Sequence, residues 1–389
     1  MEPLSPRRGL GLALCGLALA VLAWSSLHAQ PPDEAPLSAK ALRALLETAR
    51  AKHEVPALAA AWVRGEGVQA SAVVGVRKKG SDTLAGDDDL FHIGSNTKPW
   101  TALLLAWLCE QGLLDWDTPL AKVFPELEKD MSDDWKKVTV THLLTHHAGL
   151  PANLPGGWWA VPRDLGLVKQ REWVVQKTVK LKLESKPGEK FAYSNLGYVL
   201  AGAVAERLGK GTWEEQLQKV VADPLGIGTL GFGPAGVAGR LDQPRGHDAD
   251  GKAKEPALAA DNPPVMGPAG RLHLSIKDWA KFVADQVRGG RGERALLKPD
   301  TYRTMHTTPF TDTFYARGGW SGRNDPKKQP ATVLTHDGSN TFNYATVFVI
   351  PEQNIGVVVA CNQGGAPGQK ACHDAADQML KLVAKMPKK

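Results

Sequence analysis

Strand-like apolar runs stand near both ends of the chain, and helix-like patterns fill the part between them. Near the N-terminus, a helical pattern over 37–52 is followed by the runs "ALAAAWVRG" and "VQASAVVGV", which predict a hairpin. Near the C-terminus, the runs "ATVLTH", "FNYATVFVI" and "IGVVVAC" are parted by turns, and a last helix is predicted from about Gln369. We therefore expect one sheet built from both ends of the chain, with a helical insertion beside it and a cleft between the two.

The first 29 residues are predicted to be an export signal. Arg7 and Arg8 precede an apolar run from Leu10 to Trp24, which is shorter than the roughly 20 residues that a membrane-spanning helix needs. Residues 1–29 would then form a signal peptide cleaved after Ala29, and residues 30–389 a single exported domain, periplasmic or secreted. The alternative is an uncleaved N-terminal segment, which would be the protein's only contact with a membrane.

Charge and cysteine content narrow the classes of partner. The formal net charge is +6, but the Lys and Arg residues are dispersed and no nucleic-acid-binding motif occurs, so we expect no nucleic-acid partner. Three cysteines follow the signal, and the sequence leaves open whether Cys361 and Cys372 form a disulfide. The oligomeric state is not specified by any pattern in the chain.

A histidine cluster in "THLLTHHAGLP" raises the question of a metal site. His142, His146 and His147 have helical spacing, but the glutamate of a zinc-protease helix is missing. We therefore expect structural histidines and no metal or other cofactor. The alternative is a metal hydrolase that uses His142 and His146, which a chelator would inactivate.

The segment "FHIGSNTKPW" places Ser95 three residues before Lys98, where an apolar helical pattern begins. On a helix, residues three apart share a face, so the Lys98 amine can reach the Ser95 hydroxyl. A lysine with its ordinary pKa of about 10.4 is a poor base, and the chemistry needs burial or a nearby cation to lower that pKa. Serine is also a common helix cap, and the motif alone favours that interpretation.

Two further motifs change the interpretation. "PGEKFAYSNLGY" places Tyr193 and Asn195 just before an amphipathic helix, with Tyr193 suited to proton transfer and Asn195 to binding Lys98 or substrate. "LTHDGSN" ends a strand with His336 and Gly338, and a glycine there allows close backbone approach to a ligand. Each motif is weak alone.

Taken in order, Ser-x-x-Lys, Tyr-x-Asn and His-x-Gly resemble the three-motif signature of the serine β-lactamase and penicillin-binding protein superfamily, in particular its class C β-lactamase-like branch. Segments such as "VTVTHLLTHHAGLP" and "VFVIPEQNIGVVVACNQ" extend the resemblance over nearly all of residues 38–385. It implies an α/β fold of the α+β type. A mixed antiparallel sheet, from about 38–95 and 325–389, would be flanked by the N- and C-terminal helices, with an all-helical part, about 96–324, alongside.

The resemblance also implies roles for the motif residues. Ser95 would be the nucleophile that forms an acyl-enzyme, which water then hydrolyses. Lys98 and Tyr193 would share proton transfer, and which of them is the general base stays open. The backbone amides of Ser95 and Ser339 would hold the oxyanion, and His336 would line the pocket. The substrate would be a small-molecule or peptide acyl compound: an ester, an amide, a D-amino-acid peptide or a β-lactam.

Departures from the branch bear on the substrate. The position of His336 is lysine in efficient β-lactamases, and a neutral imidazole holds a carboxylate less firmly than an ammonium group does. Arg271 stands where the branch usually has a second glycine, and Asp337 would disfavour anionic ligands if its side chain points inward. We expect an ester or amide hydrolase with at most weak β-lactamase activity. The alternative is a non-hydrolytic sensor of β-lactams or wall peptides with the same fold.

Tryptophans are concentrated in two segments. "PGGWWAVP" contains Trp158 and Trp159, and "ARGGWSG" contains Trp320. They are candidates for apolar walls of the substrate site, or for ordinary packing, since aromatic side chains bury large areas anywhere in a fold.

Overall fold

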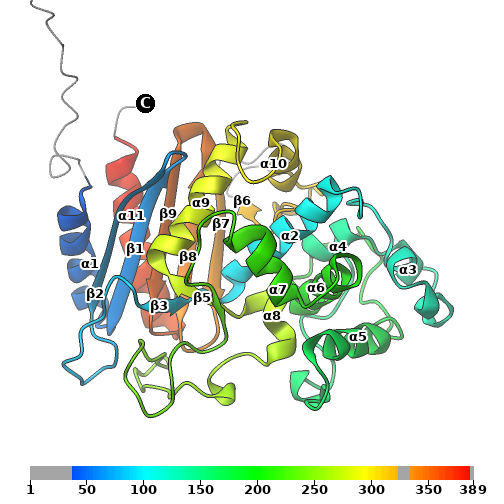
Figure 1. The fold of residues 1–389 in the computed structure, drawn as a ribbon, viewed down its shortest axis with the longest axis horizontal. Helices are drawn as coiled ribbons and strands as arrows, with labels where there is room; N and C mark the ends of the chain where they lie inside the picture. The colour runs from blue at the N-terminus through cyan, green and yellow to red at the C-terminus, as the bar shows by residue number, and fades with distance from the viewer. Residues whose placement is uncertain (1–36, 323–332, 386–389) are drawn as a thin grey trace, which may run out of the picture.

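The computed structural model describes residues 37–322 and 333–385 and is built around a six-stranded antiparallel sheet (Figure 1). Strands from both ends of the chain pair with each other, as predicted: the first strand of the N-terminal hairpin lies beside the last strand of the chain. In sheet order, the strands are β2 (Gly67–Gly75), β1 (Ala57–Arg64), β9 (Ile355–Cys361), β8 (Tyr344–Ile350), β7 (Leu334–Ser339) and β6 (Ser321–Gly322).

Helices cover both faces of this sheet, which explains the continuous apolar runs in its central strands. Every residue of β8 and β9 is buried, without the alternation of a strand that has one wet face. One face carries α1 (Ala39–His53) and α11 (Gly365–Val383), which lie side by side. The helix α11 begins four residues before the predicted Gln369, because its Gly- and Pro-containing first turn carries no apolar period.

The opposite face is covered by α9 (Ile276–Gly290), which packs on β1 and β9. Close to it lies a small three-stranded sheet in the order β3 (Leu90–His92), β5 (Leu272–Ser275) and β4 (Gly231–Phe232). The range 96–324 was expected to be all-helical, yet it contains β4, β5 and this sheet-covering helix. Strands of two to four residues are too short to show alternation in the sequence.

The remaining helices form the region beside the sheet (Figure 1). The nearly all-buried α2 and α6 lie at its centre, and α7 begins with a capping box formed by Thr212 and Glu215. Within the described ranges, no helix is both long and apolar enough to cross a membrane. The helices are α2 (Lys98–Glu110), α3 (Leu120–Val123), α4 (Val140–Leu144), α5 (Leu167–Thr178), α6 (Asn195–Gly209), α7 (Trp213–Leu217), α8 (Gly267–Gly270) and α10 (Pro299–Met305).

One sequence question is answered outside the site, and another concerns residues that the structure does not describe. Cys361 and Cys372 are buried neighbours, but both are free thiols, so the disulfide that the sequence left open is not formed. Burial, with Cys361 beside it, raises the pKa of the Cys372 thiol well above its ordinary value. The predicted signal peptide, residues 1–29, lies outside the described residues.

Candidate active site

Ser95 lies on a 3₁₀ turn, η1 (Gly94–Thr97), that leads directly into α2. The helix starts at Lys98, and Thr97 occupies its N-cap without a side-chain capping bond. Ser95 is therefore not the cap of this helix. Its hydroxyl instead lies 3.2 Å from Lys98 Nζ.

Lys98 is fully buried and contacts three oxygen atoms from three elements. Its Nζ lies 3.2 Å from Ser95 Oγ, 2.9 Å from Asn195 Oδ1 and 2.7 Å from the Ala269 carbonyl oxygen. No carboxylate pairs with Lys98 within the described part of the chain. Burial without a counter-ion lowers the pKa of Lys98 well below its ordinary value.

The three contacts suit a neutral amine. A neutral lysine has two N–H bonds and one lone pair, and Asn195 and Ala269 each present an oxygen that can only accept. With both N–H groups donated to those oxygens, the lone pair is left for the Ser95 hydroxyl. Lys98 can then accept the Ser95 proton.

Tyr193 completes the group of motif residues that the fold brings together. Its hydroxyl hydrogen-bonds with Ser95, and its ring centroid is 4.8 Å from Lys98 Nζ. Burial raises the pKa of Tyr193 above its ordinary value, although the Ser95 contact opposes this shift. Burial therefore favours neutral Lys98 over ionised Tyr193 as the base, a choice that the sequence left open.

His336 lies on β7, and both of its ring nitrogens are already bonded. Nδ1 lies 2.6 Å from the Asp337 carbonyl oxygen, which can only accept, so Nδ1 carries the proton. Nε2 then accepts from the Tyr315 hydroxyl at 2.9 Å. Burial, with the nearby Lys98, lowers the pKa of His336 to about 4, so the imidazole is neutral at neutral pH.

The next residues of β7 contact the turn that carries Ser95. A Cβ on Gly338 would lie 1.9 Å from the Ile93 carbonyl oxygen and 2.9 Å from the Ser95 nitrogen, so only glycine fits. A Cβ on Gly94, whose φ is +53°, would lie 2.3 Å from the Ser339 nitrogen. The predicted oxyanion amides, those of Ser95 and Ser339, therefore lie at one contact between η1 and β7.

Asp337 lies away from this site. Successive side chains of a strand point to opposite faces, and Asp337 lies between His336 and Gly338 on β7. Its carboxylate is 3.2 Å from His373 Nε2 on α11, on the far face of the sheet. The expected repulsion of anionic ligands by an inward-pointing Asp337 therefore does not arise.

The histidine cluster has structural contacts of three kinds. His142 completes a capping box with Thr139 at the start of α4, and His147 lies 2.9 Å from Asp312. His146 accepts the Ser194 N–H at 3.0 Å, and its ring lies 4.3 Å from the Tyr193 ring. In residues 37–322 and 333–385, no three His, Cys, Asp or Glu side chains are grouped to hold a metal.

Sequence reasoning missed Tyr315 and the position of His146. Both are buried, and their rings lie 4.4 Å apart, with the His146 ring 4.3 Å from that of Tyr193 and the Tyr315 ring 5.8 Å from that of His336. The only signal for Tyr315 was its place five residues before Trp320. The three-residue motif spacings cannot indicate such a contact, because Tyr315 and His336 are 21 positions apart.

The tryptophan segments divide between the two interpretations. Trp320 is core, fully buried near Phe282. Trp158 and Trp159 line a small cavity of about 140 Å³, and the Trp158 indole donates to Asn153 Oδ1, which also accepts from Asn195. The Trp320 segment therefore belongs to packing, whereas the segment with Trp158 is connected to Asn195 through Asn153.

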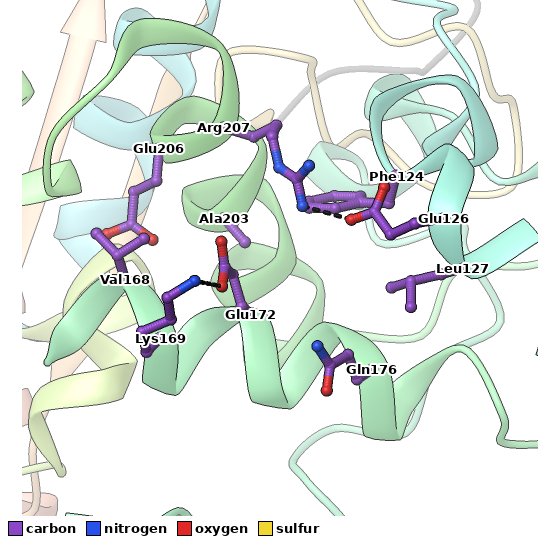
Figure 2. Close-up of a pocket in the computed structure, with 10 residues that line it drawn as sticks. All are labelled: Phe124, Glu126, Leu127, Val168, Lys169, Glu172, Gln176, Ala203, Glu206 and Arg207. Carbon is purple, nitrogen blue, oxygen red and sulfur yellow. Dashed lines mark hydrogen bonds and ion pairs between the residues drawn. The ribbon is translucent and has the colours of Figure 1, made fainter. Parts of the chain in front are cut away.

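A separate, charged cavity of about 530 Å³ lies between α5, α6 and the turn η2 (Pro125–Asp130) (Figure 2). Two ion pairs line it, Lys169–Glu172 at 2.6 Å and Arg207–Glu126 at 2.5 Å. None of its lining residues belongs to the Ser95 cluster, by which we mean Ser95, Lys98, Tyr193, Asn195 and His336. The cavity is distinct from the candidate active site.

The comparisons with known proteins agree with this fold and cover most of the chain. The family model described as Beta-lactamase matches residues 42–380. The structure is similar to a penicillin-binding protein homologue from Pyrococcus abyssi, octameric in its own structure, with a TM-score of 0.67, 24% identity and coverage of 89% of this chain and 78% of that one. It is also similar to D-alanine carboxypeptidase AmpC from Burkholderia cenocepacia, with a TM-score of 0.67, 19% identity and coverage of 88% and 100%.

Among curated proteins, the chain is 26% identical over 300 residues to "Unguisins hydrolase ungD'" from Aspergillus campestris (strain IBT 28561), which covers 72% of this chain and 54% of that protein. The chain spans about half the length of the curated relatives it matches. The match of the family model over most of the chain shows the family directly. The chain belongs to the Beta-lactamase family.

Proposed function

We propose that the protein is a serine hydrolase that forms an acyl-enzyme on Ser95 and hydrolyses an ester or amide. The observation that carries this proposal is Lys98, a buried amine without a carboxylate partner, 3.2 Å from the Ser95 hydroxyl. A structural lysine gains nothing from such a place, because burial of an unpaired charge is costly. A general base gains a neutral lone pair beside its nucleophile.

In the proposed reaction, neutral Lys98 takes the Ser95 proton as Oγ attacks the acyl carbon. The backbone amides of Ser95 and Ser339 stabilise the oxyanion. When the tetrahedral intermediate collapses, the bond to the leaving group breaks, and the leaving group takes a proton through Tyr193, which is hydrogen-bonded to Ser95. Water then attacks the ester on Ser95 and releases the acid.

The substrate that fits this site best is a neutral ester. His336 is uncharged, and each of its nitrogens is bonded within the protein, so it offers neither a cation nor a free N–H to a substrate carboxylate. A β-lactam or a peptide with a free C-terminal carboxylate lacks an anchor at this position. We therefore place ester hydrolysis above the activities that the relatives' names suggest, which concern D-alanine peptides and unguisins.

The test is a panel of p-nitrophenyl esters, a chromogenic cephalosporin and D-alanyl peptides, with labelling by a fluorophosphonate. We expect fast release of p-nitrophenol, slow cephalosporin turnover, and loss of both labelling and turnover in Ser95→Ala. Labelling retained in Ser95→Ala would contradict the proposal. One burst without steady-state turnover would instead indicate a binding protein that stays acylated, and loss of activity with a chelator would indicate a metal hydrolase.

His336→Lys tests the substrate preference separately. A lysine at 336 would place an ammonium group where the imidazole now lies, and the ratio of cephalosporin to ester turnover should rise roughly tenfold, since one added charge contact contributes about 1.4 kcal/mol or more. The matched control is His336→Gln, which adds no charge. An unchanged ratio in His336→Lys would show that position 336 does not select against carboxylates.

We also propose that this activity is exported, because residues 1–29 have the pattern of a signal peptide. The measurement is N-terminal sequencing of the protein recovered from the extracytoplasmic fraction. A first residue at Gln30 would support cleavage after Ala29. Recovery with Met1 in the membrane fraction would instead support the uncleaved segment.

A further inference from the structure

A single buried carboxylate, Asp261, binds side chains from three segments around the candidate active site. Its Oδ1 accepts from Asn340 Nδ2 at 2.9 Å, and its Oδ2 accepts from Arg271 Nε at 3.3 Å. His92 Nε2 lies 3.1 Å from one oxygen and 3.2 Å from the other. All four side chains are buried.

Each partner of Asp261 adjoins one part of the catalytic group. His92 is three residues before Ser95, and its Nδ1 accepts the Gly94 N–H at 3.1 Å. Asn340 directly follows Ser339 on the chain. These two contacts connect Asp261 to both segments that carry the predicted oxyanion amides.

Arg271 connects the same carboxylate to the Lys98 side of the site. It directly follows α8, whose Ala269 carbonyl accepts from Lys98 Nζ. The neighbouring Asn262 strengthens this connection, since its side chain donates to the Gly270 carbonyl at 2.9 Å. Asp261 is thus connected, through His92, Asn340 and Arg271, to the segments that carry the nucleophile, the second oxyanion amide and the carbonyl that contacts Lys98.

The charges of Asp261 and Arg271 compensate each other within the network. Burial would raise the pKa of Asp261, but the contacts with His92 and Arg271 hold it below its ordinary value, so the carboxylate is ionised. Because Gly94 N–H donates to Nδ1, the proton of His92 is on Nε2 and is donated to Asp261. Arg271 then pairs with Asp261 in a buried ion pair.

We propose that Asp261 is a positioning residue that holds the Ser95 and Ser339 amides in the arrangement that stabilises the oxyanion. The inference rests on the proposed function and adds a residue that no motif contains. The two segments that carry these amides pack closely at Gly94 and Gly338, so a small shift of either segment changes the separation of the two amides. Misplacement by about 1 Å is enough to reduce a rate roughly 100-fold.

Asp261→Asn is the first variant, because an amide can accept at one atom only and turns its N–H groups toward either Asn340 or Arg271, each of which is itself a donor here. Rates are measured per site that a fluorophosphonate labels to completion, so that only folded, reactive protein is counted. We expect kcat for a p-nitrophenyl ester to fall about 10- to 100-fold with little change in KM. The affinity for a boronic acid, which forms a tetrahedral adduct on Ser95, should fall by a similar factor.

Asp285→Asn is the matched control. Asp285 is an equally buried carboxylate on α9, bonded to the Tyr302 hydroxyl and the Leu296 N–H, with no contact to the Ser95 cluster. It should leave kcat per labelled site and boronate affinity unchanged. A merely structural role for Asp261 would make the two variants behave alike.

Asn340→Ala is the second variant, and it keeps the inference testable if Asp261→Asn does not fold. It removes the Asp261 contact on the Ser339 side and leaves those of His92 and Arg271, and it also removes the bonds that Asn340 Oδ1 accepts from Phe342 and Asn343. We expect about a tenfold loss in kcat and boronate affinity. If both folded variants retain wild-type values, Asp261 does not position the amides, although the proposed function stands. If the wild-type protein neither turns over esters nor binds the boronate, the proposed function is wrong, and this inference falls with it.

Discussion

The surroundings of Lys98 and of Arg171 both include residues of α6, yet the two basic side chains are buried in opposite ways. Arg171 forms a cluster with Glu206 and Glu214, called the Arg171 cluster below. At the start of α6, Asn195 presents a neutral oxygen to Lys98, and burial lowers the pKa of Lys98. Near the end of α6, Glu206 joins Glu214 in binding Arg171. Burial opposes the charge there too, but Glu214 and Glu206 raise the pKa of Arg171 above its ordinary value.

The difference separates a reactive group from a structural one. A buried ion pair is strongly destabilised when one partner is removed, because the other charge is left uncompensated. An unpaired buried amine has no such partner, and its cost to the fold appears instead as a lowered pKa. The same helix therefore contacts a fixed charge at one end and, at the other, the amine that we propose as the proton acceptor.

The largest expected effect is on activity, from Lys98→Met. Loss of the base should lower kcat/KM for an ester by roughly 10³-fold, within the range usual for general-base catalysis. The free energy of unfolding should change by less than about 2 kcal/mol, because the removed amine has no carboxylate partner and methionine fills a similar volume. Ester turnover and chemical denaturation measure the two quantities.

Lys98→Arg is the matched control for that variant. Arginine keeps a positive charge and donors but cannot act as a base near neutral pH. It should be as inactive as Lys98→Met and less stable, since its charge cannot be lost. An active Lys98→Arg would contradict the role of Lys98 as the base.

The next effect is on stability, from Arg171→Met. Glu206 and Glu214 would stay in place without their cation, at a cost of about 3–5 kcal/mol in the free energy of unfolding. The turnover of the folded fraction should stay within about threefold of wild type, because Arg171 contacts no member of the Ser95 cluster. Denaturation and active-site-titrated kinetics would show this.

Arg171→Met combined with Glu206→Gln and Glu214→Gln sharpens the result. Neutral amides remove the uncompensated charge, so the triple variant should recover part of the lost stability. A triple variant less stable than Arg171→Met alone would show that the geometry of the cluster matters more than its charge.

The order of elements was predictable, whereas their lateral contacts were not. Continuous apolar runs predicted β8 and β9, and the helical pattern predicted α2, because each signal is confined to one segment. The small sheet of β3, β5 and β4 was missed because its strands are two to four residues long. Its pairing depends on residues that are forty or more positions apart.

The site residues were also predictable only in part. Ser95, Lys98, Tyr193 and Asn195 lie in short motifs, and the fold brings them together as expected. Asp261 lies in no motif, and Arg271 stood out only as a departure from glycine. A sequence does not show that an arginine and a histidine 179 positions apart share one carboxylate, because that contact exists only after the strands have paired.

The pH profile of ester hydrolysis is a smaller effect, and it depends on the protonation of Lys98. Lys98 acts in its neutral form, so activity should fall as the pH drops through its lowered pKa, well below 10.5. Tyr193, with its pKa raised by burial, should stay protonated beyond pH 10, so no loss from its ionisation is expected below that pH. A wild-type profile that stays flat from pH 5 to pH 10 would contradict an amine base.

Stability gives the matching measurement with the sign fixed by linkage. The folded pKa of Lys98 is below the unfolded value, so protonation favours the unfolded chain between the two. The free energy of unfolding of wild type minus that of Lys98→Met should therefore rise with pH across this window and level off above about 10.4. Arg171 keeps its charge throughout, and Arg171→Met should show no such rise.

The smallest effect comes from a third cation, Arg207, which directly follows Glu206 on α6 and pairs with Glu126 at 2.5 Å in the open cavity (Figure 2). The side chains of this pair are 35% and 49% exposed, whereas Arg171 and Glu206 are 0% and 2% exposed. Water screens the first pair, so Glu126→Gln should cost less than about 1 kcal/mol and leave activity unchanged. If Glu126→Gln costs as much as Arg171→Met, then burial is not what makes the Arg171 cluster structural, and the contrast with Lys98 needs another cause.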